Sequence, residues 1–302
     1  MNAASVEGSG PVAVPGARRG AYVDFVALTK PRVNVLVLIT TVIGFHLATV
    51  GSIDLLLLVH TVMGTALVAG GAAALNQVLE RDSDRLMRRT QGRPLPAGRL
   101  STSEAGSFAL ALAGIGLVQL ALGANLLAAL VAFATIASYA LVYTPLKRRT
   151  SLATVIGAVP GALPPMIGWA AASGSLSIEA WVLFAIVFVW QMPHVLAISW
   201  MYREDYERGG IRVLPVEEPD GASTSRQTVS YAAVLIPVTL LPTAVGLAGG
   251  LYLAGALGLG VALLALAIAF ARERTAAHAR RLFFGSLLYL PVLWVLMLAD
   301  RT

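Results

Sequence analysis

Long apolar segments alternate with short polar segments along most of the chain. A transmembrane helix needs about 20 predominantly apolar residues in a row. The chain contains nine segments of this kind, so we predict nine membrane-spanning helices. Their predicted ranges are 33–50, 55–79, 104–122, 124–143, 151–172, 179–199, 228–247, 250–270 and 282–299.

The composition agrees with a membrane protein. Hydrophobic residues make up 57% of the 302 residues and charged residues only 13%, whereas about a quarter of the residues in a typical soluble domain are charged. The absence of cysteine excludes disulfides, thiolate metal sites and cysteine nucleophiles. We therefore predict an all-α polytopic membrane protein that is embedded in the lipid bilayer.

The basic residues predict the orientation of the chain. If the N-terminus is cytoplasmic, the cytoplasmic segments hold all but one of the 22 Lys and Arg residues, the exception being Arg301. An excess of Lys and Arg in cytoplasmic loops is the positive-inside rule. The C-terminus is then outside, and the net charge of +6 reflects topology and not nucleic-acid binding. The cytoplasmic segments are 1–32, 80–103, 144–150, 200–227 and 271–281.

The N-terminal residues differ in composition from the rest of the chain. Residues 1–24 begin with a stretch rich in Gly, Pro and Ala that has neither an apolar core nor a cleavable signal pattern. We predict a disordered cytoplasmic tail over 1–24 and one nine-helix domain over 25–302. Within the fifth span, the prolines of 160–165 are expected to break the helix and to mark a chamber wall, because irregular backbone at membrane depth needs such shielding.

The first long polar loop opens with a stripe of oxygen-bearing side chains. Asn76, Glu80 and Asp84 are spaced four residues apart and share one face of a helix, whereas Asp82 points away from Asp84. Mg²⁺ is usually held by one or two carboxylates together with substrate phosphates and water. The stripe therefore predicts a magnesium–diphosphate site at the membrane boundary, although a solvated helix end with ordinary charge pairs is the alternative.

Basic residues accompany this stripe. Arg89 and Arg93 follow it directly, and Lys147 and Arg148 end the fourth predicted span. Guanidinium groups bind phosphate oxygens through two parallel hydrogen bonds, which makes these residues candidates for binding a diphosphate. Lys30, before the first span, is more simply explained as a membrane anchor.

The second long polar loop follows the sixth predicted span. That span ends with Trp190 and Gln191, followed by Met192, Pro193 and His194, and acidic residues gather at 204–207 around Asp205. His194 and Asp205 lie close to one helical face unless Pro193 kinks the helix. A surface helix carrying charge pairs is again the alternative reading.

These motifs resemble those of the UbiA-type intramembrane prenyltransferases. Asn76-Gln77-x-x-Glu80-x-x-x-Asp84 and Arg89-Thr90-x-x-Arg93-Pro94-Leu95 are similar to the first signature of that family. The segments Trp190–His194 and Asp205–Val216, together with Thr29–Val33 and Tyr143–Arg148, resemble its haem-farnesylating branch. Gln77 and Glu80 replace acidic residues of the family pattern, and the second motif is reduced, so Glu204, Asp205 and Glu207 all stay open as metal ligands.

The resemblance implies a fold, a reaction and site residues. It implies nine helices around a central chamber in a bacterial inner membrane and the transfer of a farnesyl group from farnesyl diphosphate to protohaem IX. Haem is then a substrate and Mg²⁺ the cofactor, and the product passes to a downstream haem-modifying enzyme. Two alternatives to this function stay open. A UbiA-type enzyme could use a quinone precursor or chlorophyllide as the acceptor in place of haem, or the chain could be a membrane transporter. The implied catalytic residues are Asn76, Glu80, Asp84 and Asp205, of which Glu80, Asp84 and Asp205 are also the implied metal ligands. The implied diphosphate ligands are Arg89, Arg93, Lys147 and Arg148. The implied haem contacts are His194, Trp190 and Gln191.

Overall fold

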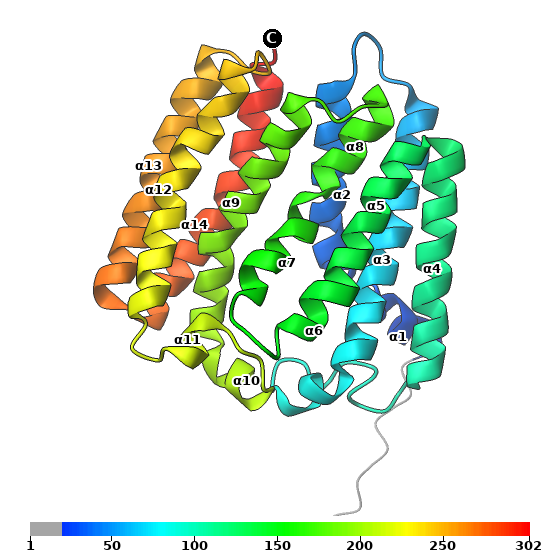
Figure 1. Cartoon of the computed structure of the whole chain (residues 1–302), viewed down its shortest axis with the longest axis vertical. Helices are drawn as coiled ribbons and strands as arrows, with labels where there is room; N and C mark the ends of the chain where they lie inside the picture. Colours follow the sequence, from blue (N-terminus) through cyan, green and yellow to red (C-terminus); the bar gives the residue numbers. More distant parts are fainter. Residues whose placement is uncertain (1–19) are drawn as a thin grey trace, which may run out of the picture.

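The structure, a computed structural model, describes residues 20–302 (Figure 1). Nine helical stretches in this part of the chain are long and apolar enough to cross a membrane, which confirms the predicted number. They are α2 (Pro31–Ala48), α3 (Leu55–Leu86), α4 (Thr102–Gly123), the stretch Leu126–Leu146 that joins α5 (Leu126–Ala137), η1 (Ser138–Tyr143) and α6 (Thr144–Leu146), the pair α7 (Ala153–Ala162) and α8 (Pro164–Ser173), α9 (Ile178–Met201), α12 (Ala222–Ala244), α13 (Gly250–Glu273) and α14 (Ala276–Ala299).

Helix α3 continues well past the predicted end of its span. It has 32 residues, and a rise of 1.5 Å per residue gives it a length of about 48 Å. The hydrocarbon core of a bilayer is only about 30 Å thick. The last turns of α3 therefore extend beyond the apolar segment that hydropathy detects, and they carry the polar stripe.

The described part of the chain begins at residue 20, before the predicted start of the nine-helix domain at residue 25, and the predicted domain bounds stay a prediction. Helix α1 (Ala21–Leu28) starts at the first described residues. Asp24 is buried and pairs with Arg99 at 3.0 Å, and Leu28 is fully buried beside Leu95. These contacts attach α1 to the loop after α3. The rest of the predicted tail, residues 1–19, lies outside the described residues.

The prolines of the fifth span break its helix as predicted. Helix α7 ends at Ala162 and α8 begins at Pro164. The break lets α8 approach α2 so closely that a Cβ at Gly44 would overlap the backbone of Pro165 and one at Gly168 the backbone of Thr41. The break therefore serves a tight helix–helix contact.

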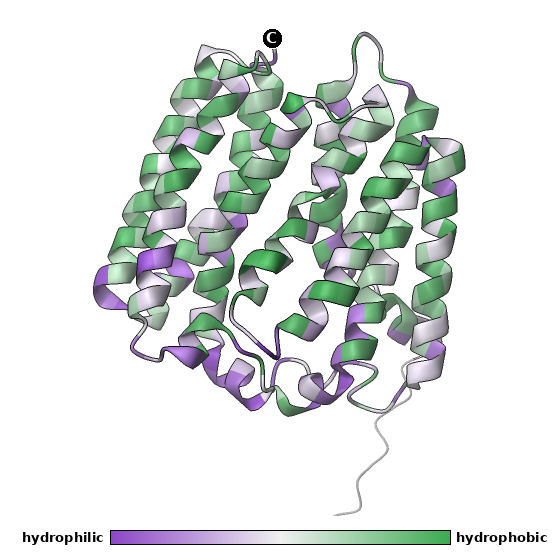
Figure 2. Cartoon of the chain, in the orientation of Figure 1, coloured by the Kyte–Doolittle hydropathy of each residue, from purple (hydrophilic) through white to green (hydrophobic). Residues whose placement is uncertain are grey.

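The polar loops gather at one end of the helices. Figure 2 shows hydrophilic residues concentrated in the loops at that end, whereas the C-terminus lies at the other end. Arg301, the basic residue that departs from the charge pattern, donates to the backbone carbonyls of His46 and Thr49. These bonds tie the end of the chain to the end of α2. Two short helices, α10 (Arg203–Arg208) and α11 (Leu214–Glu217), cover the polar end near α9.

Candidate active site at the polar end of the helices

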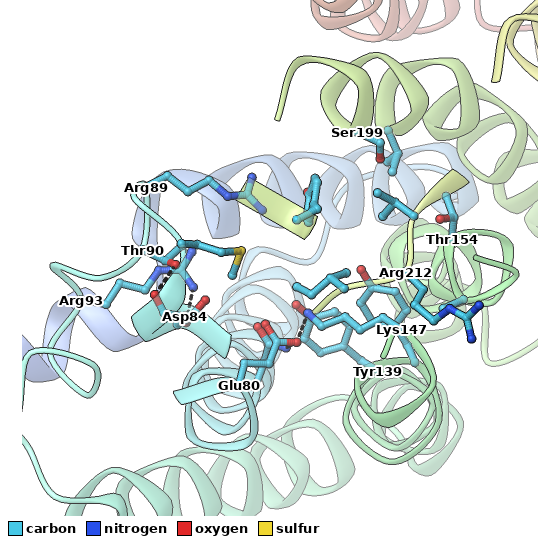
Figure 3. A pocket seen from close by; sticks show the side chains of 18 of the residues that line it. Glu80, Asp84, Arg89, Thr90, Arg93, Tyr139, Lys147, Thr154, Ser199 and Arg212 are labelled. Carbon is cyan, nitrogen blue, oxygen red and sulfur yellow. Dashed lines mark hydrogen bonds and ion pairs between the residues drawn. The ribbon is translucent and has the colours of Figure 1, made fainter. Parts of the chain in front are cut away.

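A cavity opens at the polar end, between α3, η1, α7 and α9 (Figure 3). The helices contribute one wall each, and the loops after α3 and α10 close it toward the polar end. Carboxylates, cations, tyrosines and hydroxyls face one another across it. The polar side chains that line it are Lys30, Asn76, Glu80, Asp84, Arg89, Thr90, Arg93, Tyr139, Tyr143, Lys147, Thr154, Ser199, Tyr206 and Arg212.

The stripe predicted on α3 lies along this cavity. Asn76, Glu80 and Asp84 are all buried and all line it. The Asn76 amide donates to Glu80 Oε1 at 2.6 Å, which links two members of the stripe. Asp82, on the opposite face of the helix, has 72% of its side chain exposed and forms an ion pair with its neighbour Arg81. The structure therefore separates Asp84 from Asp82 as the helical period predicts.

Asp84 offers one free oxygen to a ligand. Its Oδ2 accepts from Arg93 Nη1 at 2.7 Å, while its buried Oδ1 has no hydrogen-bond partner among residues 20–302. A buried carboxylate oxygen without a partner is costly in an empty protein interior. A hard cation at this point would satisfy it, so the donor set fits Mg²⁺.

Lysines neutralise the middle of the stripe. Lys147 forms an ion pair with Glu80, and Lys30 Nζ donates to Asn76 Oδ1 at 3.1 Å. Burial, followed by the nearby charge of Lys30, lowers the pKa of Lys147 to about 7. Burial, followed by the charge of Arg93, lowers the pKa of Lys30 to about 8. An anion in the cavity would restore full protonation of both amines.

The predicted arginines differ in their placement. Arg89 and Arg93 line the cavity, and the Arg89 guanidinium lies over the ring of Tyr206 at 4.4 Å from its centroid. Arg148 is exposed and lines a separate recess that it shares with Arg149 and Glu80. The structure therefore brings Arg89 and Arg93 to the carboxylates and leaves Arg148 outside the cavity.

Asp205 is buried but is not among the residues that line the cavity. Its Oδ1 accepts from the backbone N–H of Arg88 at 3.2 Å and from the Arg208 guanidinium. Desolvation alone would raise the pKa of this carboxyl, but the hydrogen bonds from Arg208 and from the backbone outweigh it and lower the pKa. No three His, Asp or Glu side chains within residues 20–302 lie close enough to hold a metal on their own. Metal binding by Asp205 stays a prediction.

The side chains of the Trp190–His194 motif point toward neighbouring helices. Trp190 Nε1 donates to the carbonyl of Ser286 at 2.9 Å, and the Gln191 amide donates to the carbonyl of Ala158 at 2.7 Å. His194 lies within 2.8 Å of Ser286 Oγ. Of helix α9, only Val195 and Ser199 line the cavity. Because α9 ends at Met201 and α10 is a separate helix, His194 and Asp205 do not share one continuous helical face.

Several lining residues were not predicted from the sequence. Lys30 lines the cavity and has a left-handed backbone (φ 49°) just before Pro31. Tyr139 and Tyr143 stack at 5.5 Å in the π-helical stretch η1, and π-helical turns often occur at functional sites. Two tyrosines four residues apart at the polar end of a span were the available signal. Nothing local in the sequence marks Ser199.

The sequence of the chain is similar to those of known proteins. Residues 37–290 match the sequence model of the UbiA prenyltransferase family. A protein named protoheme IX farnesyltransferase from Solibacter usitatus is 52% identical over 287 residues, which cover 92% of this chain and 98% of that protein. The protein of the same name from Myxococcus xanthus is 44% identical, with 92% and 94% covered.

Solved structures share the fold. A structure concerning digeranylgeranylglyceryl phosphate synthase in membranes has a TM-score of 0.78 at 16% identity, covering 92% of this chain and 98% of the other. A UbiA homolog from Archaeoglobus fulgidus bound to GPP and Mg²⁺ has a TM-score of 0.66 at 16% identity, covering 91% and 99%.

Proposed function

The chain belongs to the UbiA prenyltransferase family, and we propose that it transfers the farnesyl group of farnesyl diphosphate to a vinyl group of protohaem IX. The products are haem O and diphosphate. The observation that carries the proposal is the buried stripe of Asn76, Glu80 and Asp84, which faces lysines and arginines in one cavity at the end of membrane-spanning helices. The relatives with 42–52% identity that are named protoheme IX farnesyltransferase support haem as the acceptor.

We propose that Glu80 and Asp84 hold Mg²⁺ together with the diphosphate. The free Oδ1 of Asp84 supports this assignment. When bound, the metal would neutralise negative charge on the diphosphate and so make it a better leaving group. Asp205, the third metal ligand that the sequence predicts, is not among the residues that line the cavity.

The cations of the chain bind and orient the leaving group. Arg89, Arg93 and Lys147 line the cavity beside the carboxylates, so the diphosphate lies where its growing charge is stabilised. The bond between the farnesyl C1 and the diphosphate oxygen breaks, and the electron pair stays on the diphosphate. The allylic cation that remains faces Tyr139 and Tyr143, whose ring faces attract positive charge.

The acceptor then completes the reaction. The vinyl group of haem attacks farnesyl C1 and forms the new carbon–carbon bond, which leaves a cation next to the macrocycle. Water adds to that cation and loses a proton, giving the hydroxyethylfarnesyl side chain. The burial of the cavity keeps water from the allylic cation until the new bond has formed.

We further propose that Trp190, Gln191 and His194 contact haem. The Ser286 hydroxyl donates to the carbonyl of Phe283 at 2.7 Å, so its oxygen accepts from His194 Nδ1–H at 2.8 Å. This chain of bonds leaves the lone pair on Nε2, which is the arrangement that a histidine ligand of iron requires. Of these three, His194 alone has the chemistry to bind the haem iron.

The chain is a multi-pass membrane protein, and we propose that the site faces the cytoplasm. The cavity lies at the end that carries the basic loops, and the positive-inside rule assigns that end to the cytoplasm. Haem O formed there would pass to a downstream haem-modifying enzyme. Diphosphate would leave into the aqueous phase.

The test is product formation in membranes that contain the protein. Membranes are incubated with haem, farnesyl diphosphate and Mg²⁺, and the haem product is identified by mass. A matched incubation supplies an aromatic quinone precursor in place of haem. Farnesylated haem with wild-type membranes and none with Asp84→Asn membranes supports the proposal. Prenylation of the quinone precursor alone would overturn it in favour of that acceptor.

A further inference from the structure

The segment that follows α9, residues 202–209, contacts the loop that carries Arg89. The guanidinium carbon of Arg89 lies 4.4 Å from the ring centroid of Tyr206 and 5.2 Å from that of Tyr202. The two tyrosines are four residues apart, which places both rings on the same side of the α10 turn. Arg89 is also a lining residue of the cavity, so the rings hold a cation that faces the substrate site.

The same segment holds the backbone of that loop. Asp205 lies between the two tyrosines in sequence, and its Oδ1 accepts from the Arg88 N–H at 3.2 Å while it pairs with Arg208. Gly209 packs against Met87 so closely that a Cβ there would lie 2.9 Å from Met87 Cγ. The loop is therefore fixed at its backbone by a carboxylate and at its first residue by packing.

We propose that Asp205 is a positioning residue, which fixes the backbone at Arg88 so that Arg89, held by Tyr202 and Tyr206, is aimed at the diphosphate. This assignment replaces metal binding by Asp205. It rests on the proposed function, because it needs a diphosphate in the cavity. It identifies α10 as the element that orders the cationic side of the site before substrate arrives.

The distribution of carboxylates supports this division of roles. Glu80 and Asp84 line the cavity, whereas Asp205 does not. Asp84 has a buried oxygen without a partner among the described residues, whereas Oδ1 of Asp205 accepts two hydrogen bonds. A buried carboxylate oxygen without a partner among residues 20–302 is therefore found on α3, at the cavity. The carboxylate on α10 already has partners within the protein.

Restricting the Arg89 side chain before the substrate binds lowers the conformational entropy that binding costs. An arginine side chain has several rotatable bonds, and ordering them when a ligand binds costs conformational entropy. Two aromatic rings restrict the guanidinium before binding and attract its charge. The affinity for diphosphate then depends on the two tyrosines and on the bond to the Arg88 backbone, although Tyr202 and Asp205 do not line the cavity.

A double-mutant cycle tests whether Asp205 acts through Arg89. Binding of radiolabelled farnesyl diphosphate to the purified full chain is measured at saturating Mg²⁺. Asp205→Ala and Arg89→Ala are each expected to raise the Kd about tenfold, and the double variant also about tenfold, because coupled residues are not additive. A double variant weakened about a hundredfold would mean independent roles and would overturn the proposal.

Conservative variants separate positioning from metal binding. Asp205→Asn keeps the oxygen that accepts from Arg88, so we expect a Kd within about threefold of wild type and an unchanged half-saturating Mg²⁺ concentration. A tenfold rise in the Mg²⁺ requirement would overturn the proposal. Tyr202→Phe keeps a ring that does not line the cavity and should bind normally, whereas Tyr202→Leu should bind more weakly. Equal binding by both would also refute the contribution of the ring to holding Arg89.

The outcomes also distinguish this inference from the proposed function. A folded wild-type protein that does not bind farnesyl diphosphate would contradict the proposed function itself. A wild type that binds it, with an additive cycle, would contradict only the role given to Asp205. Glu218→Gln, an exposed change outside the segment that contacts Arg89, controls for nonspecific effects of removing a carboxylate and should bind as wild type does.

Discussion

Asp84→Asn should abolish most of the activity while the protein stays folded. The side chain of Asp84 is 1% exposed, and its Oδ1 has no partner in the described chain. A hydrogen bond to a charged group is worth about 1.5–3 kcal/mol, and contact with a buried metal is at least comparable. A loss of about 3 kcal/mol corresponds to roughly a hundredfold weaker binding of magnesium–diphosphate. Turnover at fixed substrate concentration should fall accordingly.

Asp82→Asn is the matched control on the same helix. Its side chain is 72% exposed and pairs with Arg81 at 2.9 Å, and exposed ion pairs are worth only about 0–1 kcal/mol. Activity should therefore stay within about twofold of wild type. Turnover is followed by the mass of the haem product, with Mg²⁺ titrated for each variant.

The stability of the two variants completes the test. Asparagine is isosteric with aspartate and can still accept from Arg93, which is itself 31% exposed. Thermal unfolding of Asp84→Asn in detergent should therefore resemble that of wild type. Equal loss of activity in both variants, or full activity in Asp84→Asn, would refute the assignment of the α3 stripe.

Three further predictions concern haem, packing and orientation. His194→Ala should weaken haem binding and change the spectrum of bound haem while leaving farnesyl diphosphate binding unchanged; an unaltered haem titration would remove the ligand role. Gly44→Ala should destabilise the protein by about 1–3 kcal/mol, because the new methyl group overlaps the backbone of α8, whereas Gly258→Ala, with open space around it, should be neutral or stabilising in thermal unfolding. A reporter fused after Thr302 should behave as periplasmic and one inserted near Gly221 as cytoplasmic; the same location for both would contradict the topology.

The helices were predictable because apolar length is a local property. Each of the nine predicted spans overlaps one of the nine helical stretches found within residues 20–302. The ends were less predictable, since a helix can continue past the membrane in polar sequence. Helix α14, for example, begins six residues before its predicted start because Thr275 caps it by accepting from the backbone N–H of His278. Hydropathy contains no information on such caps.

The site was predictable where one helix carries it. The period of the α-helix alone places Asn76, Glu80 and Asp84 on one face. Lys30 and Ser199 come from other elements, and only the tertiary fold brings them to the cavity. The hydrogen-bond partners of Asp205, the Arg88 backbone and the Arg208 side chain, depend on the start of a separate helix after α9, which hydropathy and helical period do not predict.

The length of α3 determines how a lipid-like substrate meets the enzyme. At 1.5 Å per residue, Asn76 lies about 32 Å and Asp84 about 44 Å along the axis from Leu55. A hydrocarbon core of about 30 Å therefore ends close to where the polar stripe begins. Farnesyl diphosphate can keep its charged end at headgroup depth and its isoprenoid tail among acyl chains, as any amphiphile of the leaflet does. The relevant concentration is then its mole fraction in the membrane, and the reaction rate should follow surface dilution with added lipid at constant bulk concentration.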